Sequence, residues 1–260
     1  MFEVTVLGSG SSGNATLVRS GRTSILIDAG LSYRQICLRL HAVGCGPADL
    51  DAVLVSHEHG DHVKGLRILC ARQAVPVYTA VATLATRELR EAAPARVEPI
   101  RAGKEFRVGE LTVEPFCVPH DAADPLGFAV SCNGLRLGYV TDLGFATALT
   151  RERLRDCHLL VLEANHDRDM LIDGPYPWPV KQRILSRFGH LSNGAAAELL
   201  GEVAGPELRA VVLAHISRHN NLPELARAAC EESLQACGGL GRPRILVAGQ
   251  DAPTETVRPD

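Results

Sequence analysis

Six consecutive residues, His57-Glu58-His59-Gly60-Asp61-His62, bring together side chains that can bind a transition metal. Imidazole and carboxylate groups are the ligands that zinc, manganese and iron favour. The spacing suits two metals better than one, with His57 and His59 directed at one ion and Asp61 and His62 at its neighbour. The alternative is a histidine-rich surface loop that binds nothing or binds metal only adventitiously.

The segments around this hexapeptide can aim its side chains at one point. Residues 51–55 are short, β-branched and nearly uncharged, which predicts a buried strand that ends just before the hexapeptide. Gly60 permits a sharp turn, and Asp61 is placed to cap a helix that begins near His62 and continues through residues 63–69. A strand end followed by a helix start therefore directs imidazole and carboxylate groups toward one place.

Three further apolar segments end on a side chain of the same kind. Residues 116–118 precede His120, residues 135–141 precede Asp142, and residues 210–214 precede His215. A lone histidine at a strand end is ordinarily a polar residue with a hydrogen-bond partner. The aspartate is equally compatible with capping a helix near residue 146.

Composition indicates a globular chain. Apolar residues make up 46% of the 260 residues, enough for one substantial core, so we expect a single domain over residues 1–260 with a frayed tail after about residue 252. No 20-residue apolar span and no signal peptide are present, which predicts a cytoplasmic protein with no membrane partner. The eight cysteines form no C-x-x-C pair, and we expect them to be reduced and largely buried.

The formal net charge of -3 argues weakly against a surface built for nucleic acid but does not exclude one. Only three of the 27 basic residues are lysine, and guanidinium is well shaped to bind phosphate bidentately. Composition bias explains the arginine count equally well. Only clustering of the arginines on one face would distinguish the two explanations.

Strand pairs alternate with single helices along the chain, which predicts a layered α/β sandwich. Strands are expected at residues 4–7, 16–18, 24–27, 75–78, 97–117 (three short strands) and 159–162, and helices from a cap at residue 32 to residue 40 and at 80–91, 192–201 and 223–237. The glycine- and serine-rich loop at residues 8–14 is not followed by a helix, so it is not a dinucleotide fingerprint. It can hold a phosphate or carboxylate, or serve as a plain hairpin connection.

H-E-H-G-D-H after a buried strand resembles the signature of the metallo-β-lactamase superfamily. The resemblance implies the metallo-β-lactamase fold, a four-layer αββα sandwich of two β-sheets between outer helices. It also implies that His120 is the third metal-binding histidine and that Asp142 bridges both metals. Asp28, at the end of strand 24–27, would brace the metal loop through hydrogen bonds.

The stretches E-A-N-H-D (163–167), G-P-Y-P-W-P-V-K-Q-R-I-L-S (174–186) and G-H-L-S-N (189–193) resemble a smaller family, the YycJ group, also called WalJ or VicX. The similarity extends from residue 9 to about residue 224, although Asp124 stands where the group's pattern has glutamate. The resemblance implies a nuclease with 5'-to-3' exonuclease action on DNA and a part in DNA repair.

Two histidines resemble site motifs of ribonuclease Z. His190 resembles a histidine that assists the scissile phosphate and leaving group, and the alternative is an exposed residue in a helix-capping loop whose cap is Ser192. His215 in A-H-I-S resembles the last metal ligand. The predicted residues around the ligands, which would support them or contact substrate, are Asp28, Ser192, His166 and Asn220, the last at the mouth of the site.

Taken together, one divalent ion, zinc or manganese, would be held by His57, His59, His120 and Asp142, and a second by Asp61, His62, Asp142 and His215. A hydroxide bridging the two ions would attack phosphorus, with His190 protonating the leaving oxygen. Asp61 is the other candidate for proton transfer, although a metal-bound carboxylate is a poor base. The expected function is a phosphodiesterase or nuclease that acts on nucleic acid, and the family resemblance implies that this nucleic acid is DNA.

Two other functions stay open. A thioesterase or lactonase would direct the same hydroxide at a carbonyl, and a regulatory protein would keep the metal site without turnover. The oligomeric state is not determined by the sequence.

Overall fold

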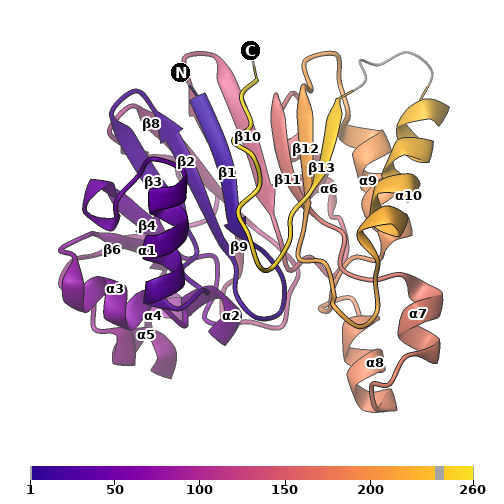
Figure 1. The fold of residues 1–260 in the computed structure, drawn as a ribbon, viewed down its shortest axis with the longest axis horizontal. Helices are drawn as coiled ribbons and strands as arrows, with labels where there is room; N and C mark the ends of the chain where they lie inside the picture. Colours follow the sequence, from indigo (N-terminus) through magenta and orange to yellow (C-terminus); the bar gives the residue numbers. More distant parts are fainter. Residues whose placement is uncertain (1, 238–242, 260) are drawn as a thin grey trace.

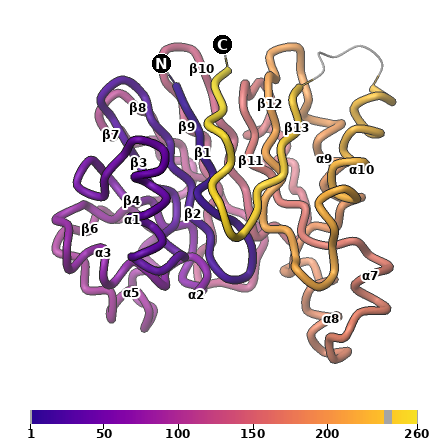
Figure 2. Tube along the Cα trace, viewed as in Figure 1, coloured from indigo at the N-terminus to yellow at the C-terminus, as the bar shows by residue number. Residues whose placement is uncertain are grey.

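The computed structural model describes residues 2–237 and 243–259. In these residues two β-sheets pack face to face, and helices cover the outer surface of each (Figures 1 and 2). One sheet has six strands in the order β1-β2-β3-β4-β5-β6, and the other has seven in the order β13-β12-β11-β10-β9-β8-β7. The four-layer αββα sandwich predicted from the sequence is confirmed.

Each sheet combines antiparallel hairpins with a parallel half. The strands are β1 (Phe2–Gly8), β2 (Ala15–Ser20), β3 (Thr23–Ile27), β4 (Ala52–Leu54), β5 (Val77–Ala80), β6 (Val97–Ile100), β7 (Phe106–Val108), β8 (Leu111–Cys117), β9 (Leu126–Cys132), β10 (Leu135–Val140), β11 (Leu159–Glu163), β12 (Ala210–Ala214) and β13 (Arg244–Val247). The helices are α1 (Tyr33–Ala42), α2 (Gly60–Val63), α3 (Leu66–Arg72), α4 (Val81–Leu84), α5 (Arg87–Ala92), α6 (Ala148–Leu154), α7 (Arg168–Asp173), α8 (Trp178–Ile184), α9 (Asn193–Val203) and α10 (Pro223–Ala236), with a 3-10 turn at Pro47–Asp49.

The parallel strands are apolar on both faces because both faces are covered. In β11, Leu159 and Val161 pack between the sheets, whereas Leu160 and Leu162 face the layer of α6, α9 and α10. A strand buried on both sides needs a continuous apolar run rather than an alternating one. This explains why the segments that precede the candidate ligands are uniformly apolar.

Two helix predictions are wrong in detail. The helix after β4 begins at Gly60 with His59 as its N-cap residue, so Asp61 lies in the first turn and does not cap it. The Asp61 carboxylate instead lies 3.2 Å from Nε2 of His215. The single helix expected at residues 80–91 is two short helices, α4 and α5.

The parallel strands place their carboxyl ends at one edge of the molecule. β3 and β4 are parallel in one sheet, and β10, β11 and β12 are parallel in the other. Their ends lie at the edge where Figure 1 places α2. The polar residues at or just after these ends are Asp28, His57, Asp142, Glu163 and His215.

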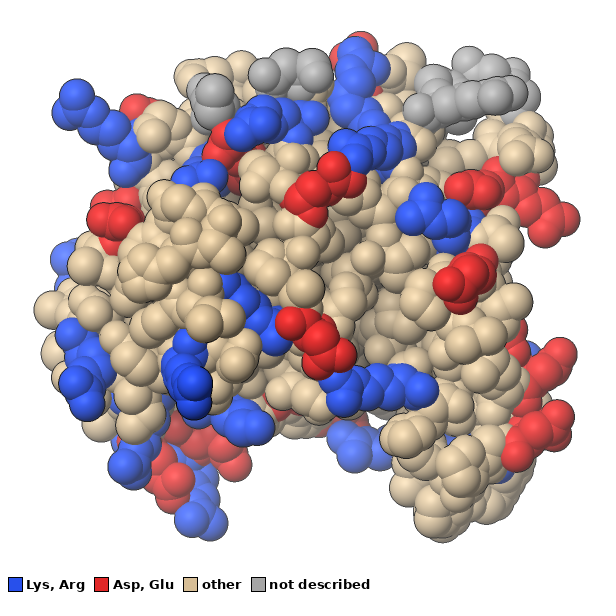
Figure 3. Space-filling model, in the orientation of Figure 1, with Lys and Arg blue, Asp and Glu red and all other residues tan. Residues whose placement is uncertain are grey.

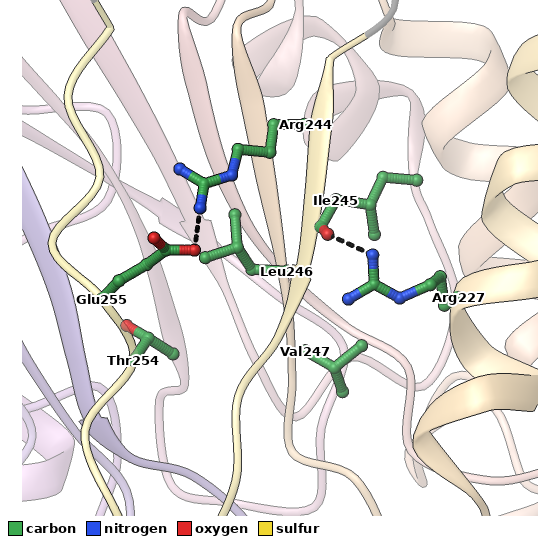
Figure 4. Close-up of a pocket in the computed structure, with 7 residues that line it drawn as sticks. All are labelled: Arg227, Arg244, Ile245, Leu246, Val247, Thr254 and Glu255. Atoms are coloured by element: carbon green, nitrogen blue, oxygen red, sulfur yellow. Dashed lines mark hydrogen bonds and ion pairs between the residues drawn. The ribbon is translucent and has the colours of Figure 1, made fainter.

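The expectation of a frayed tail is also wrong. Val257 is 3% exposed, its N–H donates to the carbonyl of Val4 (2.8 Å), and it accepts from the Val4 N–H (3.0 Å). Glu255 pairs with Arg244 of β13, so the tail lies between edge strands of the two sheets (Figure 4). The tail is held because it supplies β1 with backbone partners that the sequence pattern does not reveal.

Among the described residues, no helix has the length and apolar character needed to cross a membrane. The eight cysteines are free thiols. Four are buried and two are exposed: Cys45, Cys132, Cys157 and Cys230 are buried, and Cys117 and Cys237 are exposed.

Replacing Val257 by Ala tests the role of the tail. Loss of two buried methyl groups should lower the free energy of unfolding by about 1–3 kcal/mol. The measurement is urea denaturation followed by circular dichroism. Val81→Ala, at a position that is 53% exposed, is the matched control and should have little effect; equal stability of the two variants would show that the tail contributes nothing.

Candidate metal centre

The structure brings together all seven residues predicted to bind metal. Their ligand atoms form overlapping groups within 4.8 Å of one another: His57, His59 and His120; Asp61, His62 and His215; and His57, His62 and Asp142. The first two groups match the two predicted ions, and the third places Asp142 between them. The side chains come from both sheets, so the cluster exists only when the two sheets pack together.

The spacing within each group suits a shared ion. Nε2 of His120 lies 3.3 Å from Nδ1 of His59, and Nε2 of His215 lies 3.2 Å from Oδ2 of Asp61. Two ligands bound about 2.1 Å from one tetrahedral ion lie about 3.4 Å apart. Both pairs therefore have the separation of ligands that share a cation.

Asp142 reaches toward both groups. Its Oδ2 lies 3.0 Å from Nε2 of His62, and its Oδ1 lies 3.7 Å from Nε2 of His120 and 3.7 Å from Nε2 of His215. The carboxylate is 2% exposed. It thus has the position needed for a group that contacts two ions.

Buried polar atoms support the metal interpretation. Nε2 of His57 is buried without a hydrogen-bond partner, and Oδ2 of Asp142 is buried with Nε2 of His62 3.0 Å away. A buried polar atom without a partner costs about 1–3 kcal/mol, and more when it is charged. A divalent cation would satisfy both atoms, so the residues present fit such a group.

Backbone conformation turns three of the residues at strand ends. Asp28, Asp142 and His215 have φ angles of 62°, 56° and 57°. This left-handed conformation is uncommon for residues other than glycine and costs about 1–3 kcal/mol each. Its occurrence at three strand ends around one cluster indicates that side-chain placement there is maintained against local backbone preference.

Asp28 holds the hexapeptide in place through its carboxylate. Its Oδ2 lies 2.8 Å from Nδ1 of His62, and the same carboxylate accepts hydrogen bonds from the backbone N–H and the hydroxyl of Ser56. Because the His62 Nδ1–H donates to Asp28, the lone pair of Nε2 faces the cluster.

The glycine- and serine-rich loop after β1 makes polar contacts with residues of the cluster. The His215 N–H donates to Oγ of Ser9 (2.7 Å), and this hydroxyl donates to Oδ1 of Asn14 (2.9 Å). Nδ2 of Asn14 in turn lies 3.3 Å from Oδ2 of Asp61 and 3.1 Å from Nε2 of His62. These polar groups of the loop therefore bind other parts of the protein.

Close backbone contacts with the loops after β1 and β3 also hold α2 in place. The Asn14 N–H donates to the Asp61 carbonyl (2.7 Å), and the Ala29 N–H donates to the His62 carbonyl (2.8 Å). A Cβ on Gly30 would overlap the Asp61 carbonyl oxygen. Glycine at this position lets the helix that carries two candidate ligands lie directly against the loop after β3.

Glu163 is a site residue that the sequence analysis missed. Its Oε1 lies 2.8 Å from Nδ1 of His190 and 2.9 Å from Nδ1 of His215, and its Oε2 accepts from the N–H groups of Leu143 and Leu191. Burial alone would raise the pKa of Glu163, but the two histidines outweigh it and hold the pKa at about 2. The signal was available, because Glu163 ends the apolar strand β11.

His190 lies beside the cluster. Its ring centroid is 5.2 Å from that of His120 and 5.1 Å from that of His215, and its side chain is 20% exposed. Burial would lower its pKa, but the Glu163 carboxylate outweighs burial and raises it above the ordinary value. The geometry is that of a partly accessible imidazole held by a carboxylate, and not that of a fully exposed loop residue.

The other residues predicted near the site, Ser192, Asn220 and His166, differ in their surroundings. Ser192 caps α9 by accepting from the Ala195 N–H (3.2 Å). Asn220 is 1% exposed and does not lie at the mouth of the site, because its side chain packs against Gly174. His166 is also 1% exposed, and neither ring nitrogen has a hydrogen-bond partner.

Charges within the cluster shift its titration. Burial would raise the pKa of Asp142, but His215 and His62 outweigh burial and hold the pKa well below the usual range. Burial would lower the pKa values of His62 and His215, but the attraction of Asp142 and other carboxylates raises both well above the ordinary value. The nearby carboxylates therefore favour the protonated form of both histidines when no cation is bound.

Comparison with known proteins agrees with this geometry. The family model described as Beta-lactamase superfamily domain matches residues 23–216. The metallo-β-lactamase fold protein YhfI from Bacillus subtilis superposes over 98% of this chain and 100% of its own, with a TM-score of 0.76 and 18% identity, which shows the shared fold.

Two relatives match along most of the chain. Exodeoxyribonuclease YycJ of Bacillus anthracis is 37% identical over 240 residues, covering 91% of each chain. Exodeoxyribonuclease WalJ of Streptococcus pneumoniae is 34% identical over 245 residues, covering 92% of this chain and 91% of its own. The chain belongs to the metallo-β-lactamase superfamily and, within it, to the family of YycJ and WalJ. The resemblance identified from the sequence motifs is thereby confirmed.

Metal binding should release protons. Ligand histidines must be neutral to bind metal, so a divalent ion should displace about one to two protons per chain from His62 and His215 at neutral pH. Because the pKa values of both are raised, affinity should fall as the pH falls and rise as the pH rises. Calorimetric titration of Zn²⁺ into chelator-treated protein, in buffers of different ionisation enthalpy, measures the release. His41→Ala should leave it unchanged, and a pH-independent affinity would contradict the assignment.

Proposed function

We propose that this protein is a metal-dependent exodeoxyribonuclease that hydrolyses phosphodiester bonds of DNA in the 5'-to-3' direction with two divalent ions, zinc or manganese. The observation that carries the proposal is the buried Asp142 carboxylate between two groups of imidazole and carboxylate ligand atoms. The names of the relatives YycJ and WalJ support DNA as the substrate. A cytoplasmic role in DNA repair suits such an activity.

The proposed ligands divide into two sets. One ion would be held by His57, His59, His120 and Asp142, and the other by Asp61, His62, His215 and Asp142. When bound, such ions supply positive charge against the phosphate oxygens and lower the pKa of water.

His190 is the proposed proton donor. Its Nδ1–H donates to Glu163, which leaves Nε2 available to substrate, and the Glu163 carboxylate outweighs burial and raises the pKa of the ring, which favours its protonated form. A protonated imidazole beside the scissile bond can donate a proton to the leaving oxygen.

Asp61 suits a ligand better than an acid. Burial would raise its pKa, but the hydrogen bond with His215 and the charge of His62 outweigh burial and lower it. We therefore propose Asp61 as a metal ligand, with proton transfer as its secondary role.

A substrate panel tests the function. Metal-loaded protein incubated with 5'-phosphorylated DNA, RNA and thioesters should cleave DNA, and chelation should abolish cleavage. Asp142→Ala should lose bound metal, measured by mass spectrometry of the ions, together with activity. Asp124→Ala, in the loop after His120, is the matched control and should keep both; turnover confined to thioesters would eliminate the nuclease proposal.

His190→Ala tests the proton donor. The variant should keep its metals but lose about 10²–10⁴-fold in kcat on DNA. Thymidine 5'-(4-nitrophenyl phosphate), whose leaving group needs no proton, should be affected far less. His41→Ala on α1 should match the wild type on both substrates, and an equal loss on both substrates in His190→Ala would assign His190 a different role.

A further inference from the structure

A groove of about 570 Å³ is lined by residues that lie within three positions of His120, Asp142 or His190 in the chain, together with residues of α6 and its N-terminal side. Its walls come from the end of β8, the loop before α6 with the first turn of that helix, and the loop between α8 and α9. The residues that matter here are Pro119, Phe145, Leu149, Arg187 and Phe188. The motif interpretation assigned no role to these residues.

The groove is attached to the site through the backbone. His120 Nδ1 lies 3.1 Å from the Gly189 carbonyl, and the Asp121 N–H donates to the Phe188 carbonyl (3.2 Å). Phe188 is also only two residues from His190 in the chain. The groove wall and two side chains of the centre are therefore positioned by the same short segments.

Backbone contacts of Gly144 also hold the groove residues Pro119 and Arg187 in place. The Gly144 N–H donates to the Pro119 carbonyl (2.8 Å), and a Cβ on Gly144 would overlap the Arg187 carbonyl oxygen. Gly144 follows Asp142 by two residues. A ligand in the groove would consequently lie at a defined position relative to the candidate metals.

The groove presents aromatic surface and positive charge together. Phe188 is 57% exposed and Leu149 is 38% exposed. The Arg187 guanidinium lies 4.3 Å from the ring centroid of Phe145, in a cation–π arrangement. Aromatic rings and guanidinium groups are the surfaces on which proteins stack the bases of single-stranded nucleic acid.

Over the part of the chain that the structure describes, the face of the molecule drawn in Figure 3 carries no continuous basic band. Figure 3 shows basic and acidic side chains interspersed on its face, with a notch at the lower edge between the body and the lobe that Figure 1 identifies as α7 and α8.

We propose that this groove binds the nucleobase next to the scissile phosphate, with the base stacked on Phe188 and Arg187 supplying positive charge beside it. The proposal rests on the proposed nuclease function and specifies how it holds a strand end. Because every base has a π-face, binding would be independent of sequence.

Cleavage of abasic DNA tests the subsite. In the wild type, removing the base next to the scissile bond should raise KM by about 10- to 100-fold, the range expected for one stacked base. Phe188→Ala should raise KM on intact DNA by a similar factor, yet add little on abasic DNA, with bound metal unchanged. Phe188→Trp should restore KM, and Leu38→Ala, on α1 at a position 59% exposed, should match the wild type.

A binding measurement separates this inference from the function. An oligonucleotide with 2-aminopurine at its 5' end should lose fluorescence on binding to chelator-treated wild type but not to Phe188→Ala. Quenching without DNA cleavage would overturn the nuclease proposal and support the groove. Cleavage with equal KM for intact and abasic DNA, or equal quenching by both proteins, would overturn the groove assignment and leave the nuclease intact.

Discussion

The charge of Asp142 is the constraint on which the site depends. An ionised carboxylate that is 2% exposed is strongly unfavourable unless positive charge lies beside it. Its neighbours are the imidazoles of His62, His120 and His215, all within 3.7 Å of its oxygens. Protonation of His62 and His215, which the raised pKa values favour, would supply positive charge in the metal-free protein, and divalent cations would supply more. The same electrostatic demand thus explains both the raised histidine pKa values and the fit to metals.

The architecture of the sandwich brings the groups that meet this electrostatic requirement to one edge of the molecule. Parallel strands place several carboxyl ends at one edge, and face-to-face packing brings the ends of two sheets together. His57 follows a strand of one sheet and Asp142 a strand of the other, so neither sheet alone contains the cluster. The left-handed backbone at Asp28, Asp142 and His215 shows that the ends of these strands are strained. Packing of the apolar layers on both sides of each sheet stabilises that strain.

The sequence predicts those parts of the fold and site that depend on local pattern. Apolar runs that end on candidate ligand side chains predicted β4, β10 and β12. The same rule applied to β11 would have identified Glu163 as a site residue. Predictions failed where the decisive partner is distant in sequence. The cap predicted at Asp61 is wrong because its carboxylate lies beside His215, as the predicted ligand set requires. The tail after residue 252 reads as frayed, yet Val257 pairs with Val4, and Asn220 is polar but buried.

Glu163 contacts two histidines, His190 and His215, for which different roles are proposed. Its Oε1 lies within 2.9 Å of Nδ1 on both His190 and His215, so it fixes the same tautomer in both rings. In His215 the freed Nε2 faces Asp61, where its lone pair can serve a cation. In His190 the ring is partly exposed, and its freed Nε2 is the atom proposed to donate a proton to substrate. Positive charge gathered around His215 lowers the pKa of the nearby His190, because like charges repel, while Glu163 raises it. The two effects oppose each other at His190 because the candidate ligand His215 and the proposed proton donor share one buried carboxylate.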